Sequence, residues 1–238
     1  MEVERGKIFV VSTPIGNLGD ITYRAVETLK SVDLIICEDT RVTKVLLDHY
    51  GISKPLLVIN AHNETKMLEK ILEKIESGIN CGLVSDAGTP CISDPGARLI
   101  NRLVAENVFV VGIPGVTAGI LALSISGLPT DSFVFEGFLP LKKGRQKKLL
   151  NLSTEDRTII LYESTYRIKK LLEEINEYMP QREIVVAREL TKKFEETWRG
   201  TAGHILTDFE KKTVKGEFAI VIAPLTWNKK DSENHSES

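Results

Sequence analysis

The chain has 238 residues, of which 42% are hydrophobic and 27% charged, and its formal net charge at pH 7 is −2. These values are typical of a soluble globular protein with one large or two small domains. They exclude a global basic field, so a nucleic-acid partner would need a local patch of positive charge. The longest apolar stretches have the length of strands, which is too short to span a membrane.

Cysteine and histidine usage indicates a reducing compartment and no metal site. The three cysteines, Cys37, Cys81 and Cys91, are odd in number and lack the Cys-x-x-Cys spacing, so we expect reduced thiols in a cytoplasmic protein. The four histidines are scattered along the chain, so we expect no structural metal. The N-terminal residues lack the basic-then-apolar pattern of a signal peptide.

The first 125 residues alternate between strand and helix patterns. Apolar runs predict five strands, at 7–12, 33–37, 56–59, 79–84 and 108–111. Helical patterns follow them, and we expect Asp20 to cap the first helix and Asp94 and Pro95 to begin the helix that ends at Glu106. This rhythm predicts an α/β fold in which residues 1–125 form a mostly parallel sheet with helices on both faces.

Four loops of this first domain carry unusual numbers of Gly, Pro, Asp and Thr. They follow strands, at 13–20, 38–41, 85–94 and 112–118. The carboxyl ends of parallel strands meet at one edge of a sheet, which is where open α/β sheets bind ligands. Structural turns would explain any one loop, but the four together favour a composite small-molecule pocket.

The segment 85–96 is the richest of these, with two Asp, three hydroxyl residues, two Gly and two Pro. Asp86 could accept a hydrogen bond from an ammonium or a ribose hydroxyl, although a tight turn is the simpler alternative. In the loop 13–20, Pro14 and Ile15 are expected to form a wall against a ligand. Thr117 either contacts the ligand or only caps the next helix.

The character of the chain changes near residue 127. Five shorter strands are predicted, at 132–136, 158–162, 183–188, 194–199 and 216–223. Their close spacing favours a mixed sheet, so we expect a C-terminal α/β domain over residues 126–227, with an interdomain linker at 137–140 and a disordered tail at 228–238.

A basic segment lies in this second domain. Residues 140–170 hold three acids and nine cations: Lys142, Lys143, Arg145, Lys147, Lys148, Arg157, Arg167, Lys169 and Lys170. Such a local excess could bind RNA phosphates, and a solvated helix face is the alternative. Glu163 ends a strand, where it could act as an acid or base or pair with Arg167 four residues later. His62, after another strand, is a candidate proton acceptor or a hydrogen-bonded loop residue.

Taken together, several contiguous motifs resemble the tetrapyrrole methylase superfamily, the class III methyltransferases that use S-adenosylmethionine. The closer resemblance is to the members that methylate small-subunit ribosomal RNA. The motifs are TPIGNLGD at 13–20, EDTR at 38–41, SDAGTPCISDPG at 85–96, SGLPT at 126–130, FEGFLP at 135–140 and RELTK at 188–192. The resemblance covers residues 7 to 224.

This resemblance implies two α/β domains with S-adenosylmethionine in a cleft between them, and a homodimer. By position, the implied cofactor contacts are Pro14, Ile15, Ser85, Asp86, Thr89, Thr117, Ala118, Tyr162 and Leu190. The implied reaction is 2′-O-methylation of a cytidine ribose in the decoding region of 16S rRNA, on free RNA or on the small ribosomal subunit. Methylation of a tetrapyrrole or a modified protein side chain, and a non-catalytic RNA-binding assembly factor, are the alternatives.

A general base would help the ribose hydroxyl to attack. The candidates are Asp39, Glu163 and His62, while Arg41, Arg167 and the cations of 142–148 are expected on RNA phosphates. The family often has Pro-His after Tyr-Glu-Ser, but this chain has Thr165 and Tyr166 there, so a histidine base is unavailable at that place.

Overall fold

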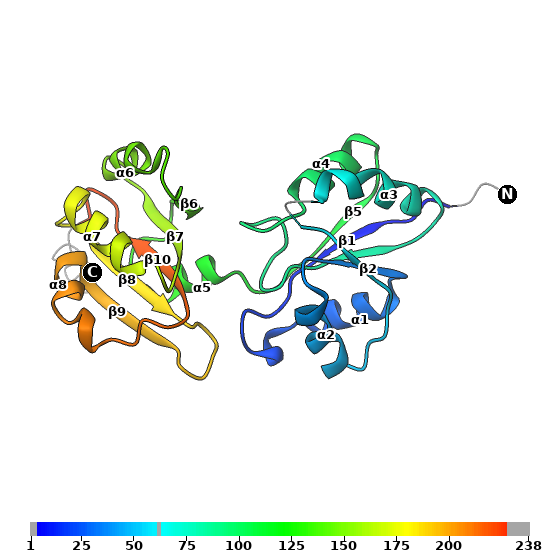
Figure 1. Ribbon diagram of the computed structural model, residues 1–238, viewed down its shortest axis with the longest axis horizontal. Helices are drawn as coiled ribbons and strands as arrows, with labels where there is room; N and C mark the ends of the chain where they lie inside the picture. Colours follow the sequence, from blue (N-terminus) through cyan, green and yellow to red (C-terminus); the bar gives the residue numbers. More distant parts are fainter. Residues whose placement is uncertain (1–3, 61–62, 228–238) are drawn as a thin grey trace, which may run out of the picture. The chain divides into compact units, whose positions relative to one another are not determined.

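The computed structural model describes residues 4–60 and 63–227, so His62 and the tail 228–238 lie outside the described residues. The chain forms two compact units, Met1–Thr117 and Ala118–Ser238 (Figure 1). The sequence placed the boundary after residue 125. The helix α5 (Ala118–Ser124) belongs to the second unit because it packs on strands of that unit's sheet. Within the described residues, no helix is long and apolar enough to cross a membrane.

The first unit is built on a five-stranded parallel sheet in the order β3-β2-β4-β1-β5. The strands are β1 (Ile8–Val11), β2 (Leu34–Cys37), β3 (Leu56–Val58), β4 (Cys81–Leu83) and β5 (Val110–Ile113). Helices cover both faces, as predicted: α1 (Tyr23–Ser31) and α2 (Thr40–His49) on one, α3 (Glu64–Glu76) and α4 (Ala97–Ala105) on the other (Figure 1). Each face buries its own apolar core, and the parallel pairing places the carboxyl ends of all five strands at one edge of the sheet.

Two predicted helix starts are wrong. Asp20 lies in a short 3-10 helix, η1 (Leu18–Asp20), and Thr22 caps α1 by accepting a hydrogen bond from the Ala25 amide. Helix α4 begins after Gly96, which has φ 117°, and not at Asp94 and Pro95. A Cβ at residue 96 would lie 3.0 Å from the Leu83 side chain, so the chain reaches the helix through a left-handed glycine that the capping pattern did not anticipate.

The second unit contains a mixed five-stranded sheet in the order β6-β7-β10-β8-β9, as the sequence predicted. The strands are β6 (Phe133–Phe138), β7 (Thr158–Ser164), β8 (Glu183–Arg188), β9 (Glu196–Thr201) and β10 (Glu217–Ile222). Only β6 and β7 pair in parallel. Helices α6 (Arg145–Ser153), α7 (Ile168–Tyr178) and α8 (Ala202–Thr207) share one core with the sheet, α5 packs on β7 and β10, and the 3-10 helix η2 (Phe209–Lys211) follows α8.

The strand β6 contains a β-bulge that the sequence did not reveal. Phe135 pairs with Ile160 and Phe138 with Tyr162, so Glu136 is an extra residue in the ladder. Gly137 has φ 60°, which a glycine adopts without strain. The bulge therefore places Phe135 and Phe138 on the same face of the sheet, although they are three positions apart in the sequence. The predicted linker at 137–140 is wrong, since residues 137 and 138 continue the strand.

Candidate functional site

The four polar loops of the first unit come together at one edge of its sheet. Thr13 and Gly88 form a backbone bridge, in which each amide donates to the other carbonyl with nitrogen-to-oxygen distances of 2.8 and 3.1 Å. The Asp39 amide donates to Asp86 Oδ1 at 3.1 Å, and the hydroxyls of Thr89 and Thr117 lie 2.9 Å apart. The predicted convergence of these loops is confirmed, and the loop 85–94 is the one that contacts the other three.

A chain of three hydroxyls crosses this edge. Ser12 Oγ lies 2.9 Å from Thr89 Oγ1, which is also 2.9 Å from Thr117 Oγ1. A Cβ at residue 115 would lie 2.6 Å from the Ser12 Cβ, so Gly115 is what lets the two loops approach. Sequence reasoning missed Ser12 because it read as the last residue of a strand. The hydroxyls provide donors and acceptors suited to a polar ligand.

Four acids gather at the same edge, and their protonation equilibria differ. Burial raises the pKa of Asp94 to about 6, and it also raises the pKa of Asp86 and of Glu38. Hydrogen bonds from Arg41 lower the pKa of Asp39 to about 2. Asp94, expected only as a helix cap, is instead a member of this cluster. Such an edge favours a cationic ligand.

The remaining predicted cofactor contacts are distributed over both units. Pro14 and Ile15 are buried in the first unit, and the buried Ser85 hydroxyl donates to the Ala87 carbonyl at 3.3 Å. Ala118 begins α5 of the second unit. In the same unit, Leu190 is buried after the end of β8, and the Tyr162 hydroxyl accepts a hydrogen bond from the Gly119 amide at 2.8 Å. These residues therefore form two groups, each ordered within its own unit.

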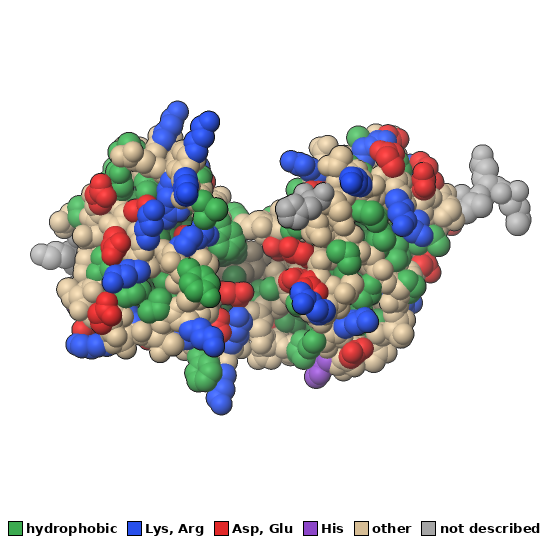
Figure 2. All heavy atoms as spheres, viewed as in Figure 1, with side chains coloured by type: hydrophobic (Ala, Val, Ile, Leu, Met, Phe, Trp, Pro, Cys, Tyr) green, Lys and Arg blue, Asp and Glu red, His purple; other side chains and the backbone are tan. Residues whose placement is uncertain are grey.

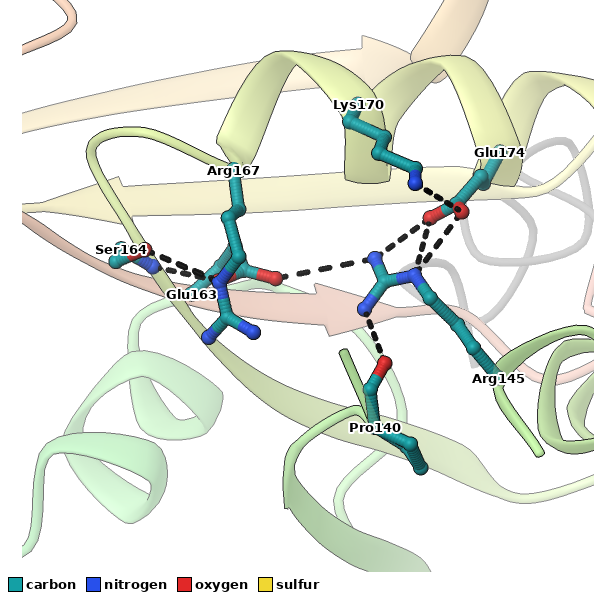
Figure 3. A network of polar contacts seen from close by, with 7 residues as sticks. All are labelled: Pro140, Arg145, Glu163, Ser164, Arg167, Lys170 and Glu174. Carbon is teal, nitrogen blue, oxygen red and sulfur yellow. Dashed lines mark hydrogen bonds and ion pairs between the residues drawn. The ribbon is translucent and has the colours of Figure 1, made fainter. Parts of the chain in front are cut away.

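Glu163 is enclosed by an ionic network in the second unit (Figure 3). Its Oε1 atom lies 2.7 Å from Arg167 Nε and accepts the Ser164 amide at 2.8 Å. Its Oε2 atom is buried, accepts no hydrogen bond from any described residue, and lies 3.9 Å from Arg145 Nη2. With its side chain fully buried, Glu163 holds the two guanidinium groups in place and is badly placed to take a proton from a bound substrate.

Arg145 differs from its basic neighbours. It is buried, and it donates through Nε and Nη2 to Glu174 and through Nη1 to the Pro140 carbonyl (Figure 3). Lys142, Lys143 and Lys147 are exposed, and Lys148 pairs with Glu136 at 2.6 Å. Figure 2 shows Lys and Arg side chains gathered over α6. The structure thus makes Arg145 part of the framework of this surface, while the lysines face solvent.

Of the other predicted residues, Arg41 is 89% exposed and makes a bidentate pair with Asp39, with contacts of 2.5 to 3.1 Å.

No group of three or more His, Cys, Asp or Glu side chains in the described part of the chain is arranged to hold a metal ion.

Comparison with known proteins shows the family to which the chain belongs. The model of the Tetrapyrrole (Corrin/Porphyrin) Methylases matches residues 7–206. The chain belongs to the tetrapyrrole methylase family. It is 50% identical over 223 residues to the ribosomal RNA small subunit methyltransferase I of Synechocystis sp., covering 93% of this chain and 80% of that relative. It is 45% identical to the protein of that name from Thermotoga maritima, covering 92% and 98%.

The solved structures of other tetrapyrrole methylases share the fold at low sequence identity. A cobalt precorrin-4 methyltransferase has a TM-score of 0.68 and 18% identity, covering 91% of this chain and 94% of that one. A uroporphyrin-III C-methyltransferase from Thermus thermophilus, solved with S-adenosylhomocysteine, has a TM-score of 0.65 and 17% identity, covering 92% and 98%. At these identities the likeness concerns the fold alone.

As a tetrapyrrole methylase, the chain is an S-adenosylmethionine-dependent methyltransferase. The residues at the edge of the first sheet fit this cofactor. The acids Glu38, Asp86 and Asp94 suit a ligand that carries a sulfonium and an ammonium, and the hydroxyl chain from Ser12 to Thr117 suits a nucleoside.

Proposed function

We propose that this protein transfers a methyl group to the 2′-hydroxyl of a cytidine in the decoding region of 16S rRNA. The observation that carries the proposal is the 45–50% identity, over more than nine-tenths of the chain, to relatives named as small-subunit rRNA methyltransferases. The exposed lysines around α6 support it, because they supply the local positive charge that a chain of net charge −2 needs to bind RNA.

In this proposal the cofactor supplies an electrophilic methyl group, and the protein binds and orients the reactants. Asp86 and the hydroxyls of Thr89 and Thr117 hold the cofactor in the first unit, together with Pro14, Ile15 and Ser85, and Ala118, Tyr162 and Leu190 are the contacts proposed in the second. Orientation of two bound reactants alone accounts for a large part of the rate in such reactions.

The three candidate bases differ in their suitability. Arg41 lowers the pKa of Asp39 to about 2, which makes its carboxylate a weak base near neutral pH. Glu163 is enclosed by Arg145 and Arg167, and His62 lies outside the described residues. Positioning is therefore the main contribution we assign to this chain. Asp94, whose pKa is about 6, is matched in strength to accept a proton.

Mass mapping of 16S rRNA tests the proposal. RNA from cells with and without the gene is digested, and methylated nucleotides are located by mass spectrometry, with the wild-type gene and Asp86→Asn supplied on a plasmid. We expect one cytidine to lose a ribose methyl group without the gene and to regain it with the wild type alone. Unchanged rRNA methylation, or a methyl group on the base, would refute the assignment, and purified enzyme incubated with uroporphyrinogen tests the tetrapyrrole alternative.

We further infer that the protein acts as a homodimer in the bacterial cytoplasm, where its rRNA substrate is made. The relatives' bacterial sources and the three unpaired cysteines support this location. Light scattering coupled to size-exclusion chromatography measures the oligomeric state, and a monomer at micromolar concentration would contradict the dimer.

A further inference from the structure

One exposed ring in the second unit is held against a cation. The β-bulge in β6 places Phe138 on the side of the sheet that carries Tyr162. The two rings contact each other in a T-shaped arrangement, with 5.7 Å between their centroids. Phe138 remains 51% exposed, and the Arg167 guanidinium carbon lies 5.8 Å from its ring centroid. A half-exposed ring with a fixed orientation, next to a guanidinium, has the geometry on which nucleic-acid bases stack.

Arg167 is oriented for a ligand by the groups behind it. Its Nε binds Glu163 Oε1 at 2.7 Å and Ser164 Oγ at 3.2 Å. Figure 3 shows both terminal nitrogens pointing away from Glu163, and no described residue makes a hydrogen bond to either. The network around Glu163 therefore presents a planar, pre-ordered guanidinium, whose plane can stack on a base and whose terminal nitrogens can donate hydrogen bonds to the RNA.

The neighbouring surface has matching charge. Two residues after Phe138, the Pro140 carbonyl accepts a hydrogen bond from Arg145, which ties this segment to α6. The exposed Lys142, Lys143 and Lys147 lie on or just before that helix. Tyr166, the residue before Arg167, is 96% exposed and is a second exposed ring, next to Arg167 in the sequence. Aromatic rings interleaved with cations are characteristic of surfaces for unpaired nucleic acid.

We propose that Phe138 and Arg167 form a stacking platform for one base of an unpaired RNA segment, whose phosphates lie on the lysines around α6. This proposal rests on the proposed function, since it specifies which form of RNA the enzyme binds. It assigns Glu163 as a positioning residue for Arg167. It also predicts a preference for single strands over duplex, because a paired base has no free face to stack.

Binding titrations of the full chain test the platform. Fluorescence anisotropy of a labelled single-stranded RNA and of a duplex of the same length is measured at several salt concentrations. We expect Phe138→Leu to weaken single-strand binding about 5- to 100-fold, with an unchanged salt slope and little change for the duplex. Phe138→Trp, which keeps an aromatic face, should bind as the wild type does.

Two further variants separate stacking from folding and from charge. Arg167→Lys keeps the charge but loses the planar fork, and should also weaken single-strand binding at constant salt slope. Phe194→Leu is the matched control, because Phe194 is a 64% exposed ring with Lys193 over it, outside the basic segment and next to Glu195 and Glu196. It should leave both affinities unchanged.

Wild-type affinity in both Phe138→Leu and Arg167→Lys would overturn the platform, as would equal losses for single strand and duplex. The two proposals fail separately. If the platform variants lose single-strand binding but 16S rRNA methylation does not depend on the gene, the platform stands and the substrate assignment falls. If 16S rRNA methylation depends on the gene but the variants bind RNA as the wild type does, the substrate assignment stands and the platform falls.

Discussion

Asp94 shows that the acidic edge of the first unit is held at a cost in stability. Burial raises its pKa from 3.8 to about 6, so the folded protein binds this proton more tightly than the unfolded chain does. The stabilisation from that preference is fully present below pH 3.8 and is lost as the pH rises through about 6. Near neutral pH the folded state therefore carries a carboxylate that would be better solvated in the unfolded chain.

We predict that Asp94→Asn stabilises the protein at pH 7.5. A rise of about two pKa units corresponds to at most about 3 kcal/mol, and partial exposure reduces the expected gain to about 1 kcal/mol. Urea unfolding of the two proteins should show this difference at pH 7.5 and none at pH 3.5. Asp48→Asn, at an exposed position of α2, is the control. A variant less stable than the wild type at pH 7.5 would contradict the argument.

Asp86 accepts a hydrogen bond from the Asp39 amide, and we propose that it also binds the cofactor. We predict that Asp86→Ala weakens binding of S-adenosylmethionine by roughly 1.5–3 kcal/mol, because a charged hydrogen-bond acceptor is lost. Asp86→Asn keeps an acceptor for the Asp39 amide, so its loss of affinity reports the charge alone. Calorimetry on folded variants measures both, and unchanged affinity in the two variants would remove Asp86 from the site.

At the scale of the element, α6 combines a buried cation with exposed ones. Arg145 faces the core and contacts Glu174, whereas Lys147, two residues later, faces solvent. The helix therefore depends on one of its basic residues for stability and presents others for binding.

We predict that Arg145→Gln destabilises the protein by about 1.5–3 kcal/mol, because Glu174 loses its guanidinium partner and the buried Glu163 keeps only Arg167. Lys147→Gln should change the free energy of unfolding by less than about 0.5 kcal/mol. Denaturant titrations compare the two variants. Equal effects would show that the ion pair in Figure 3 contributes little.

Replacing Lys142, Lys143 and Lys147 together by Gln should instead act on RNA binding. If each contacts one phosphate of a single strand, the slope of log K against log salt should fall by about 2 in magnitude. Affinity for S-adenosylhomocysteine serves as the control and should not change. An unaltered salt slope would mean that these lysines form only a solvated face.

The elements also show how far the sequence could predict this structure. The strand β8 was predicted at its observed bounds, and the four loops were predicted to meet, because apolar runs and the topology of parallel sheets determine both. The start of α4 could not be predicted, since the close approach of Gly96 to Leu83 is a tertiary contact. The same is true of Arg145, which composition could not distinguish from its exposed neighbours, and of the bulge that orients Phe138.

At the scale of the whole molecule, each unit has a hydrophobic core of its own. The proposed cofactor contacts include Thr117 in the first unit and Tyr162 and Leu190 in the second. We predict that S-adenosylhomocysteine at about 100 times its Kd stabilises both units by up to about 2.7 kcal/mol. Differential scanning calorimetry should show every unfolding transition moving upward, and the Tyr162→Phe variant should shift less. A shift confined to one transition would place all the contacts in one unit.

The bulge at Glu136 also affects whether strand β6 can pair with a strand of a second molecule. The strand β6 lies at the edge of its sheet, and a regular edge strand offers unpaired backbone groups to any neighbouring chain. The extra residue interrupts that template, and the Glu136 side chain carries an ion pair to Lys148 at the same point. Deleting Glu136 would straighten the edge, because residues 135, 137 and 138 would then pair without interruption with Ile160, Leu161 and Tyr162. We therefore expect the deletion to cause concentration-dependent aggregation, visible by light scattering, so the irregularity that orients a ring also protects the protein from intermolecular strand pairing.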